Sequence, residues 1–223
     1  MPTNRKRSCS EIRNDMISEW QIAQPRRVRR IVTRSGRGVR GVFPSRKSSK
    51  PAEFESLAEE MALLVLEIAT SITHIETQPT VFEFCDSDAS RRYTPDIATQ
   101  SAVGTTYFEV KYDKALAPDG DTVTRLRRAV NHLRGEGHVL RFLLESELAA
   151  SHLPNKIREL LRARPPRGRY RANIDPTLWD PECGTSPGPA MLERWQSAQR
   201  QCDELLARVM RRDPDDLLPA EQR

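Results

Sequence analysis

The chain of 223 residues lacks a long hydrophobic run. Its longest apolar stretch, at residues 61–69, is interrupted by Glu67 and is far too short to cross a bilayer. No apolar segment follows the basic residues 5–7, so we expect neither a secretory signal nor a membrane partner. A composition of 37% hydrophobic and 30% charged residues is typical of a soluble, charge-rich protein.

Cysteine and histidine are equally sparse, with four of each. The cysteines form no Cys-x-x-Cys pair, and no histidine stands at zinc-ligand spacing or beside a nucleophile. We therefore expect a reduced, cytoplasmic protein without a zinc site and without a Cys/His or Ser/His catalytic pair.

Positive charge is abundant but unevenly distributed. Residues 1–50 carry fourteen lysines and arginines against three acids. The net charge of the whole chain is +5, so the rest of the chain is net negative. A second basic stretch, 156–171, holds seven cations and one acid. Such blocks commonly contact nucleic-acid phosphates through counterion release. A solvated arm that only aids solubility is the alternative.

The order of predicted elements indicates an α/β fold with a central mixed sheet flanked by helices. A basic N-terminal arm (1–50) would precede an α/β core (51–145) and a small helical C-terminal region (146–223). Apolar residues at three- and four-residue spacing predict a helix from about Ala52, with Glu55 and Glu59 on one face. The other predicted helices are 121–134, 153–162 and 190–211. The predicted strands are 72–84 (interrupted at Pro79), 93–99, 105–112 and 138–144, with a turn at 85–90 and a hairpin between 93–99 and 105–112.

Two acids and a lysine on the predicted hairpin are the most informative feature. Asp96 follows Pro95, while Glu109 and Lys111 flank Val110 in an apolar strand. Because strand side chains alternate, Glu109 and Lys111 project to one side and Val110 faces the core. Two carboxylates and an ammonium suit a hard divalent cation and a polarised water, and hence phosphodiester hydrolysis. A turn-capping Asp and a solvent-facing Glu-x-Lys ion pair are the plainer reading of the same residues.

This pattern resembles the PD-(D/E)xK nuclease superfamily and, more closely, the TnsA-like endonuclease subunit of heteromeric cut-and-paste transposases. Three further segments carry the resemblance: the basic residues 34–47, Phe-Glu-Ser-Leu-Ala-Glu at 54–59, and Ile-Glu-Thr-Gln-Pro at 75–79. Together the matched segments span about residues 30–115. The resemblance implies a restriction-endonuclease-like core.

The resemblance also implies roles for individual residues. Asp96, Glu109 and the Val110 carbonyl would hold Mg²⁺ or Mn²⁺, with Glu59 completing the ligand shell directly or through water. Glu55 is the alternative helix acid. Lys111 would orient the attacking water or stabilise charge on the phosphate. The basic arm would bind DNA through Arg34, Arg37, Arg40, Arg46 and Lys47.

By the same resemblance, this subunit would cleave double-stranded DNA at the 5′ ends of a transposon. A DDE transposase would cut the 3′ ends, and an AAA+ ATPase regulator would contact the C-terminal region. The setting would be a bacterial cytoplasm, at the nucleoid when DNA is bound. A stand-alone restriction or repair nuclease and a catalytically silent DNA-binding assembly factor are the alternatives. The helix at 190–211 would either dock a partner or serve a structural or oligomerising role.

Overall fold

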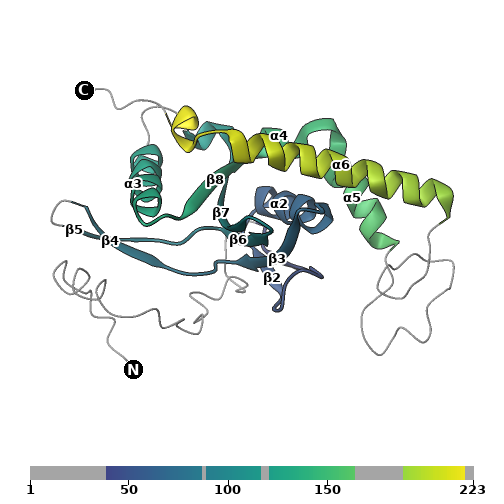
Figure 1. The fold of residues 1–223 in the computed structure, drawn as a ribbon, viewed down its shortest axis with the longest axis horizontal. Coiled ribbons are helices and arrows are strands. Elements are labelled where there is room, and N and C mark those ends of the chain that lie inside the picture. Colours follow the sequence, from purple (N-terminus) through teal and green to yellow (C-terminus); the bar gives the residue numbers. More distant parts are fainter. Residues whose placement is uncertain (1–38, 87–88, 117–120, 164–187, 219–223) are drawn as a thin grey trace.

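The computed structural model describes residues 39–86, 89–116, 121–163 and 188–218, which form a mixed α/β architecture (Figure 1). The strands are β1 (Gly41–Phe43), β2 (Ala52–Phe54), β3 (Ile72–Thr77), β4 (Phe82–Asp86), β5 (Ala89–Tyr93), β6 (Ile97–Ser101), β7 (Gly104–Lys111) and β8 (Val139–Leu144). The α-helices are α2 (Leu57–Ile68), α3 (Asp121–Gly135), α4 (Glu145–Ala149), α5 (Leu153–Arg162) and α6 (Pro189–Arg211). Short 3-10 turns are η1 (Asp113–Leu116), η2 (Ala150–His152) and η5 (Pro214–Leu217).

The central sheet has four strands in the order β3-β6-β7-β8. The first three are antiparallel, whereas β7 and β8 are parallel. A parallel pair needs a crossover connection, and α3 lies within it. The predicted mixed sheet flanked by helices is therefore confirmed.

Each face of the sheet packs against a different hydrophobic cluster. Alternate residues of β7 (Phe108 and Val110) face the cluster that α2, α5 and α6 complete. Tyr107, which precedes Phe108, faces the second cluster, which contains residues of α3 and of the β4–β5 hairpin. Glu109 lies on the same side as Tyr107, so its carboxylate is directed into the space between the sheet, α3 and the hairpin.

Helix α6 covers the face of the sheet to which Phe108 and Val110 of β7 point. Its buried residues recur every three or four positions, and they are Trp195, Ala198, Cys202, Leu205, Leu206 and Val209. They share one cluster with the buried residues of α2 and α5, so the C-terminal region completes the hydrophobic core. No helix among the described residues is long and apolar enough to cross a membrane.

The structure corrects the predicted start of the first core helix. Residues 52–54 form strand β2, which pairs with β1, and α2 begins only at Leu57. The Ser56 hydroxyl accepts a hydrogen bond from the Glu59 amide at 3.1 Å and so caps the helix. Glu55 therefore precedes the helix, and the prediction that it shares a helical face with Glu59 is wrong.

The predicted hairpin is also corrected. Strand β7 pairs with β6 over Ile97–Ser101, but Tyr93 ends strand β5, which pairs with β4. Residues 85, 86, 89 and 90, which were predicted to form a turn, lie in β4 and β5. The interruption predicted at Pro79 within the 72–84 strand is confirmed, since Pro79 lies between β3 and β4. The predicted elements at 121–134, 138–144, 153–162 and 190–211 are confirmed to within one residue.

Candidate active site

The predicted carboxylates meet where β6 begins and β7 ends. Ile97 pairs with Phe108 in the antiparallel register, so the preceding Asp96 lies across from Glu109. The Val110 amide donates to Oδ2 of Asp96 at 2.8 Å, which holds this carboxylate against β7. The structure thus brings together the two acids that the sequence placed thirteen residues apart.

The backbone of Asp96 is held by a residue in an unusual conformation. Gln78 has a φ of 46°, in the left-handed region that residues other than glycine seldom adopt. Its amide donates to the Asp96 carbonyl at 2.9 Å. Non-glycine residues in this region commonly mark functional sites, because the surrounding structure has to hold them there. Gln78 belongs to the Gln-Pro segment that follows β3.

The Lys111 ammonium lies among three of the four groups predicted to bind a metal, the exception being Glu59. Its Nζ is 2.6 Å from Oε1 of Glu109, 3.7 Å from Oδ2 of Asp96 and 3.1 Å from the Val110 carbonyl oxygen. Burial by itself would lower the pKa of Lys111, but the carboxylates of Glu109 and Asp96 outweigh it and raise the pKa. The ammonium is therefore held in its charged form.

Asp96 is the most perturbed acid of the site. Burial, followed by the nearby charge of Glu109, raises its pKa to about 8, although Lys111 and the Val110 amide oppose the shift. Glu109 itself is only 3% exposed. Two carboxylates in a poorly solvated place create a need for positive charge. A perturbed acid of this kind, with specific charge partners, is typical of functional sites.

Tyr93 is a site residue that the sequence did not reveal. Its hydroxyl donates to Oε2 of Glu109 at 2.7 Å, on the opposite side of the carboxylate from Lys111. Burial and the adjacent Glu109 charge raise the pKa of Tyr93 well above its usual value, so the phenol stays protonated and donates. No short sequence motif marks this contact, because the packing of the β4–β5 hairpin creates it.

Glu59 lies near the site but has a structural role of its own. Its Oε2 accepts from the Glu55 amide at 2.8 Å, and its Oε1 accepts from the Ser56 hydroxyl at 3.0 Å. These contacts form a capping box at the start of α2. Burial raises the pKa of Glu59, and its charge in turn acts on Asp96 and Lys111. Glu55 instead lies within 4.0 Å of Arg40.

The predicted DNA-binding residues are only partly described, because Arg34 and Arg37 lie outside the described ranges. Arg40 is near Glu55, and the Arg46 amide donates to the buried Glu67 at 3.0 Å. The Lys47 ammonium donates to the carbonyls of Leu66, at 2.9 Å, and of Ala69, so it caps the end of α2. DNA contact by these residues stays a prediction.

The donor set of the site fits Mg²⁺ or Mn²⁺. Two carboxylates and a backbone carbonyl are the hard oxygen ligands that these ions take, and here all three already converge on one cation, the Lys111 ammonium. Glu59 is within electrostatic reach of this group. Within the described ranges, no three His, Cys, Asp or Glu side chains stand close enough together to form a metal cluster by themselves.

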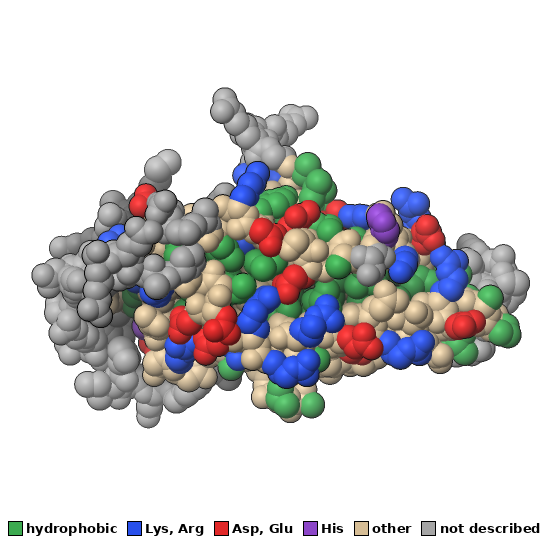
Figure 2. All heavy atoms as spheres, turned by 90° about the horizontal axis from the view of Figure 1, so that it is seen from above, with side chains coloured by type: hydrophobic (Ala, Val, Ile, Leu, Met, Phe, Trp, Pro, Cys, Tyr) green, Lys and Arg blue, Asp and Glu red, His purple; other side chains and the backbone are tan. Residues whose placement is uncertain are grey.

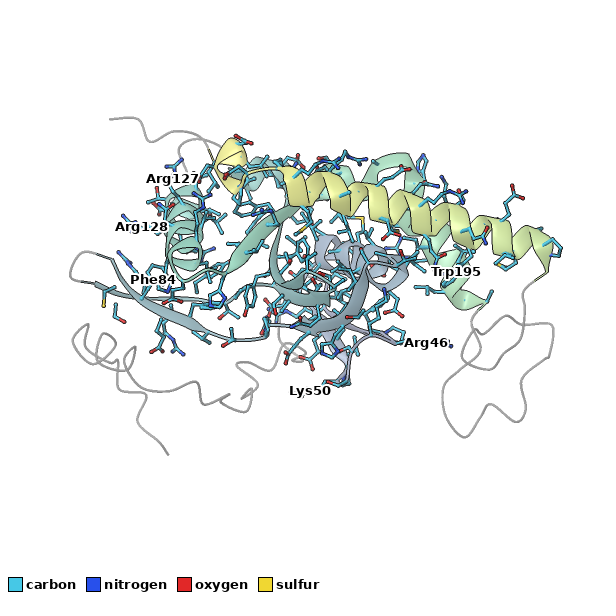
Figure 3. The ribbon with its side chains drawn as sticks, viewed as in Figure 1. Arg46, Lys50, Phe84, Arg127, Arg128 and Trp195 are labelled. Atoms are coloured by element: carbon cyan, nitrogen blue, oxygen red, sulfur yellow. The ribbon has the colours of Figure 1, made fainter. Side chains whose placement is uncertain are left out.

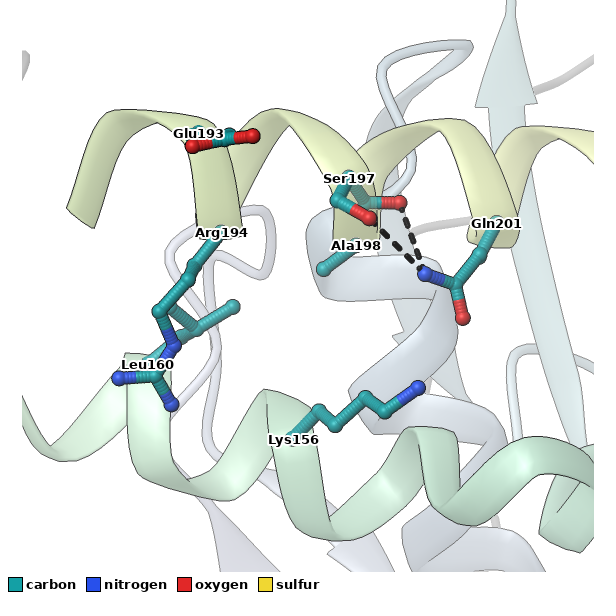
Figure 4. A pocket seen from close by; sticks show the side chains of 7 residues that line it. All are labelled: Lys156, Leu160, Glu193, Arg194, Ser197, Ala198 and Gln201. Atoms are coloured by element: carbon teal, nitrogen blue, oxygen red, sulfur yellow. Dashed lines mark hydrogen bonds between the residues drawn. The ribbon is translucent and has the colours of Figure 1, made fainter. Parts of the chain in front are cut away.

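A pocket of about 420 Å³ lies between α5 and α6, and neither Asp96 nor Glu109 lines it (Figure 4). Lys156, Glu193 and Arg194 give it mixed charge, and Gln201 Nε2 donates to the Ser197 hydroxyl at 3.1 Å within its wall. It contains none of the predicted catalytic residues. Its lining groups offer no obvious nucleophile or acid pair.

Comparison with known proteins assigns no family to the chain. No protein-family model matches the sequence, and a search of curated proteins finds no match.

Proposed function

We propose that the protein is a metal-dependent DNA endonuclease of the PD-(D/E)xK type with a restriction-endonuclease-like core. The observation that carries this proposal is the convergence of Asp96, Glu109 and the Val110 carbonyl on Lys111 at the end of a mixed sheet. Carboxylates that share one cation at a sheet edge suit phosphodiester hydrolysis.

Each residue of the site has a separate role in the proposed hydrolysis. Asp96 and Glu109 would hold the ion, and Tyr93 orients Glu109 through its hydroxyl at 2.7 Å. A bound Mg²⁺ supplies Lewis-acid polarisation of the scissile phosphate and lowers the pKa of the attacking water. Lys111, kept charged by its neighbours, donates hydrogen bonds to that water or to the phosphate oxygens.

More specifically, we propose that this nuclease is the TnsA-like subunit of a heteromeric transposase, which cleaves at the 5′ ends of the element. The sequence resemblance over the basic arm, the 54–59 segment and the Gln-Pro segment supports this assignment. A DDE transposase and an AAA+ regulator are then its protein partners. The contribution of α6 to the core favours a structural role for this helix, and leaves its exposed face for any partner.

The test is cleavage of supercoiled plasmid and of duplex transposon ends by the full-length protein, with Mg²⁺ or Mn²⁺, alone and with a cognate transposase. We expect metal-dependent nicking that Asp96→Ala and Lys111→Ala each reduce by about 10²-fold or more. Asp216→Asn and Lys114→Ala are matched exposed controls. Full activity in either site variant would refute the assignment.

The pattern of activity also separates the alternatives. Nicking only with the transposase present supports the transposase subunit. Sequence-specific cleavage by the protein alone supports a stand-alone nuclease. Assembly on DNA without nicking under any metal supports a silent assembly factor.

A further inference from the structure

A positively charged pocket of about 610 Å³ lies beside the carboxylate site, between the β4–β5 hairpin and α3. Four arginines line it, two from each element: Arg91 and Arg92 from β5, and Arg125 and Arg128 from α3. Among the described residues that line the pocket, Asp121 is the only acid. Arg92 also pairs with Oε1 of Glu83 at 3.1 Å, and the described lining side chains still carry more positive than negative charge.

Aromatic packing holds the two walls of this pocket in place. Phe84 of β4 stacks on His132 of α3, with ring centroids 4.6 Å apart and an angle of 21° between the planes. Phe82 of the same strand packs edge-on against Tyr107 of the central sheet at 5.2 Å. The hairpin is thus anchored both to α3 and to the sheet.

The arginines occupy positions suited to a shared ligand. Arg125 and Arg128 are three residues apart, so they lie on one face of α3. Arg91 pairs across the hairpin with Phe84, whose ring packs toward α3. Arg128 and Phe84 lie at the same end of the molecule, where α3 is above the β4–β5 ribbon (Figure 3).

The pocket is also connected to the carboxylates through one side chain. Tyr93 lines the pocket, and its hydroxyl donates to Glu109 at 2.7 Å. Arg125 acts electrostatically on both Tyr93 and Lys111. Tyr93 is therefore the side chain that links the pocket to the Asp96–Glu109–Lys111 site.

The chemistry of the lining points to phosphate. Guanidinium groups bind phosphate oxygens through paired hydrogen bonds, and Ser90 and Thr124 add hydroxyl donors. Arginine can also bind the O6 and N7 atoms of guanine, so the comparison of unrelated duplexes is what separates phosphate contact from base reading. By contrast, the face along α6 shows lysines and arginines interspersed with acids, as expected for a plain solvated surface (Figure 2).

We propose that the four-arginine pocket binds consecutive backbone phosphates of DNA, without reading base sequence, and guides that strand to the carboxylate site. The binding of phosphates stands on the pocket itself, whereas the guiding role rests on the proposed nuclease function. This DNA contact is separate from the basic arm at residues 34–47.

The test is the affinity of the full-length protein for a short labelled duplex, measured by fluorescence anisotropy in EDTA over a series of salt concentrations. We expect Arg125→Ala/Arg128→Ala to weaken binding roughly tenfold at low salt, and by similar factors for unrelated sequences. The slope of log affinity against log salt should fall by about 1–2, as expected for one or two lost phosphate contacts. Arg91→Ala/Arg92→Ala, on the other wall, should have the same effect.

Arg200→Ala/Arg211→Ala, on the exposed side of α6, is the matched control and should bind as the wild type does. Unchanged affinity and slope in both pocket variants would overturn the proposal. Displacement of the duplex by inorganic phosphate at matched ionic strength, at concentrations comparable to those of DNA phosphate, would also overturn it in favour of a small-anion site. Because EDTA removes the metal, this result is independent of whether the protein cleaves.

Discussion

Among the single side chains, Lys111 has the most informative position, because its ammonium contacts Asp96, Glu109 and the Val110 carbonyl, three of the four groups predicted to bind a metal. The plainer reading of a solvent-facing ion pair does not fit, since the Lys111 side chain is only 18% exposed and that of Glu109 only 5%. Two neighbouring carboxylates with so little solvent exposure need a cation close to them. Lys111 meets this need in the absence of a metal and remains available as a hydrogen-bond donor when a metal is bound.

We predict that Lys111→Ala destabilises the metal-free protein by about 1–3 kcal/mol, because it removes the positive charge beside Glu109 and Asp96 and leaves them the uncharged donors Tyr93 and the Val110 amide. Lys114→Ala, on the exposed η1 turn, should change stability by less than about 0.5 kcal/mol. Urea unfolding in EDTA measures both. Equal stability of the two variants would mean that the ion pairs of Lys111 contribute nothing.

The raised pKa of Asp96 predicts a pH dependence of stability. An acid whose pKa rises on folding, here from 3.8 to about 8, makes the folded state progressively less stable as pH rises through that interval. The raised pKa of Lys111 changes the pH dependence of stability only near and above its ordinary value of 10.5, which lies outside this window. In EDTA, we therefore expect the Tm to fall between pH 5 and pH 8 by an amount equivalent to roughly 1 kcal/mol or more.

Asp96→Asn should flatten much of this pH dependence, and millimolar Mg²⁺ should flatten it in the wild type. Thermal melts followed by circular dichroism at a series of pH values make both comparisons. The same slope in Asp96→Asn as in the wild type would assign the effect to other groups.

Among the helices and strands, the start of α2 combines a structural and a proposed catalytic role. Ser56 and Glu59 form a capping box, and Glu59 also acts on the charges of Asp96 and Lys111. Ser56→Ala should cost about 1 kcal/mol of stability and leave nicking largely intact. Glu59→Gln removes the negative charge but keeps an oxygen that can accept one of the two hydrogen bonds, and it leaves the Ser56 cap on the residue 59 amide in place.

We therefore expect Glu59→Gln to lose at most about 1 kcal/mol of stability and to lose nicking activity. Denaturant unfolding and nicking rates, measured on the same preparations, separate the two roles. If Glu59→Gln nicks at the wild-type rate, Glu59 is a capping residue only.

Helix α6 is expected to be integral to the fold. Trp195 is 5% exposed within the cluster that includes α2. Trp195→Ala should destabilise the protein by about 3–5 kcal/mol, whereas Leu192→Ala, at 36% exposure, should cost far less. A small effect of Trp195→Ala on chemical denaturation would instead favour a separately folded docking helix.

For the molecule as a whole, the sequence predicted the periodic elements well and their junctions poorly. Alternation along β7 placed Glu109 and Lys111 on one side, and regular apolar spacing located α3 and α6. The early helix start was wrong because Phe54 continues the apolar spacing of α2 by coincidence, although the Ser56-x-x-Glu59 capping box was a readable signal.

The contacts that the sequence did not reveal depend on tertiary packing. Tyr93 reaches Glu109 because the β4–β5 hairpin folds against α3, and no local spacing encodes that arrangement. The four-arginine pocket arises from the same packing, since its two walls are about thirty residues apart in the chain. Residues that are far apart in the sequence form such sites only in the folded structure, so sequence patterns do not predict them.

Divalent-ion binding tests the proposed centre most directly, because it does not require a partner protein. Isothermal titration of the full-length, metal-free protein with Mn²⁺ should show saturable binding in the wild type. The Asp96→Asn/Glu109→Gln variant should fold, as judged by circular dichroism, and show no such binding. If the wild type fails to bind Mn²⁺, or if this double variant binds it equally well, Asp96 and Glu109 do not form a metal centre.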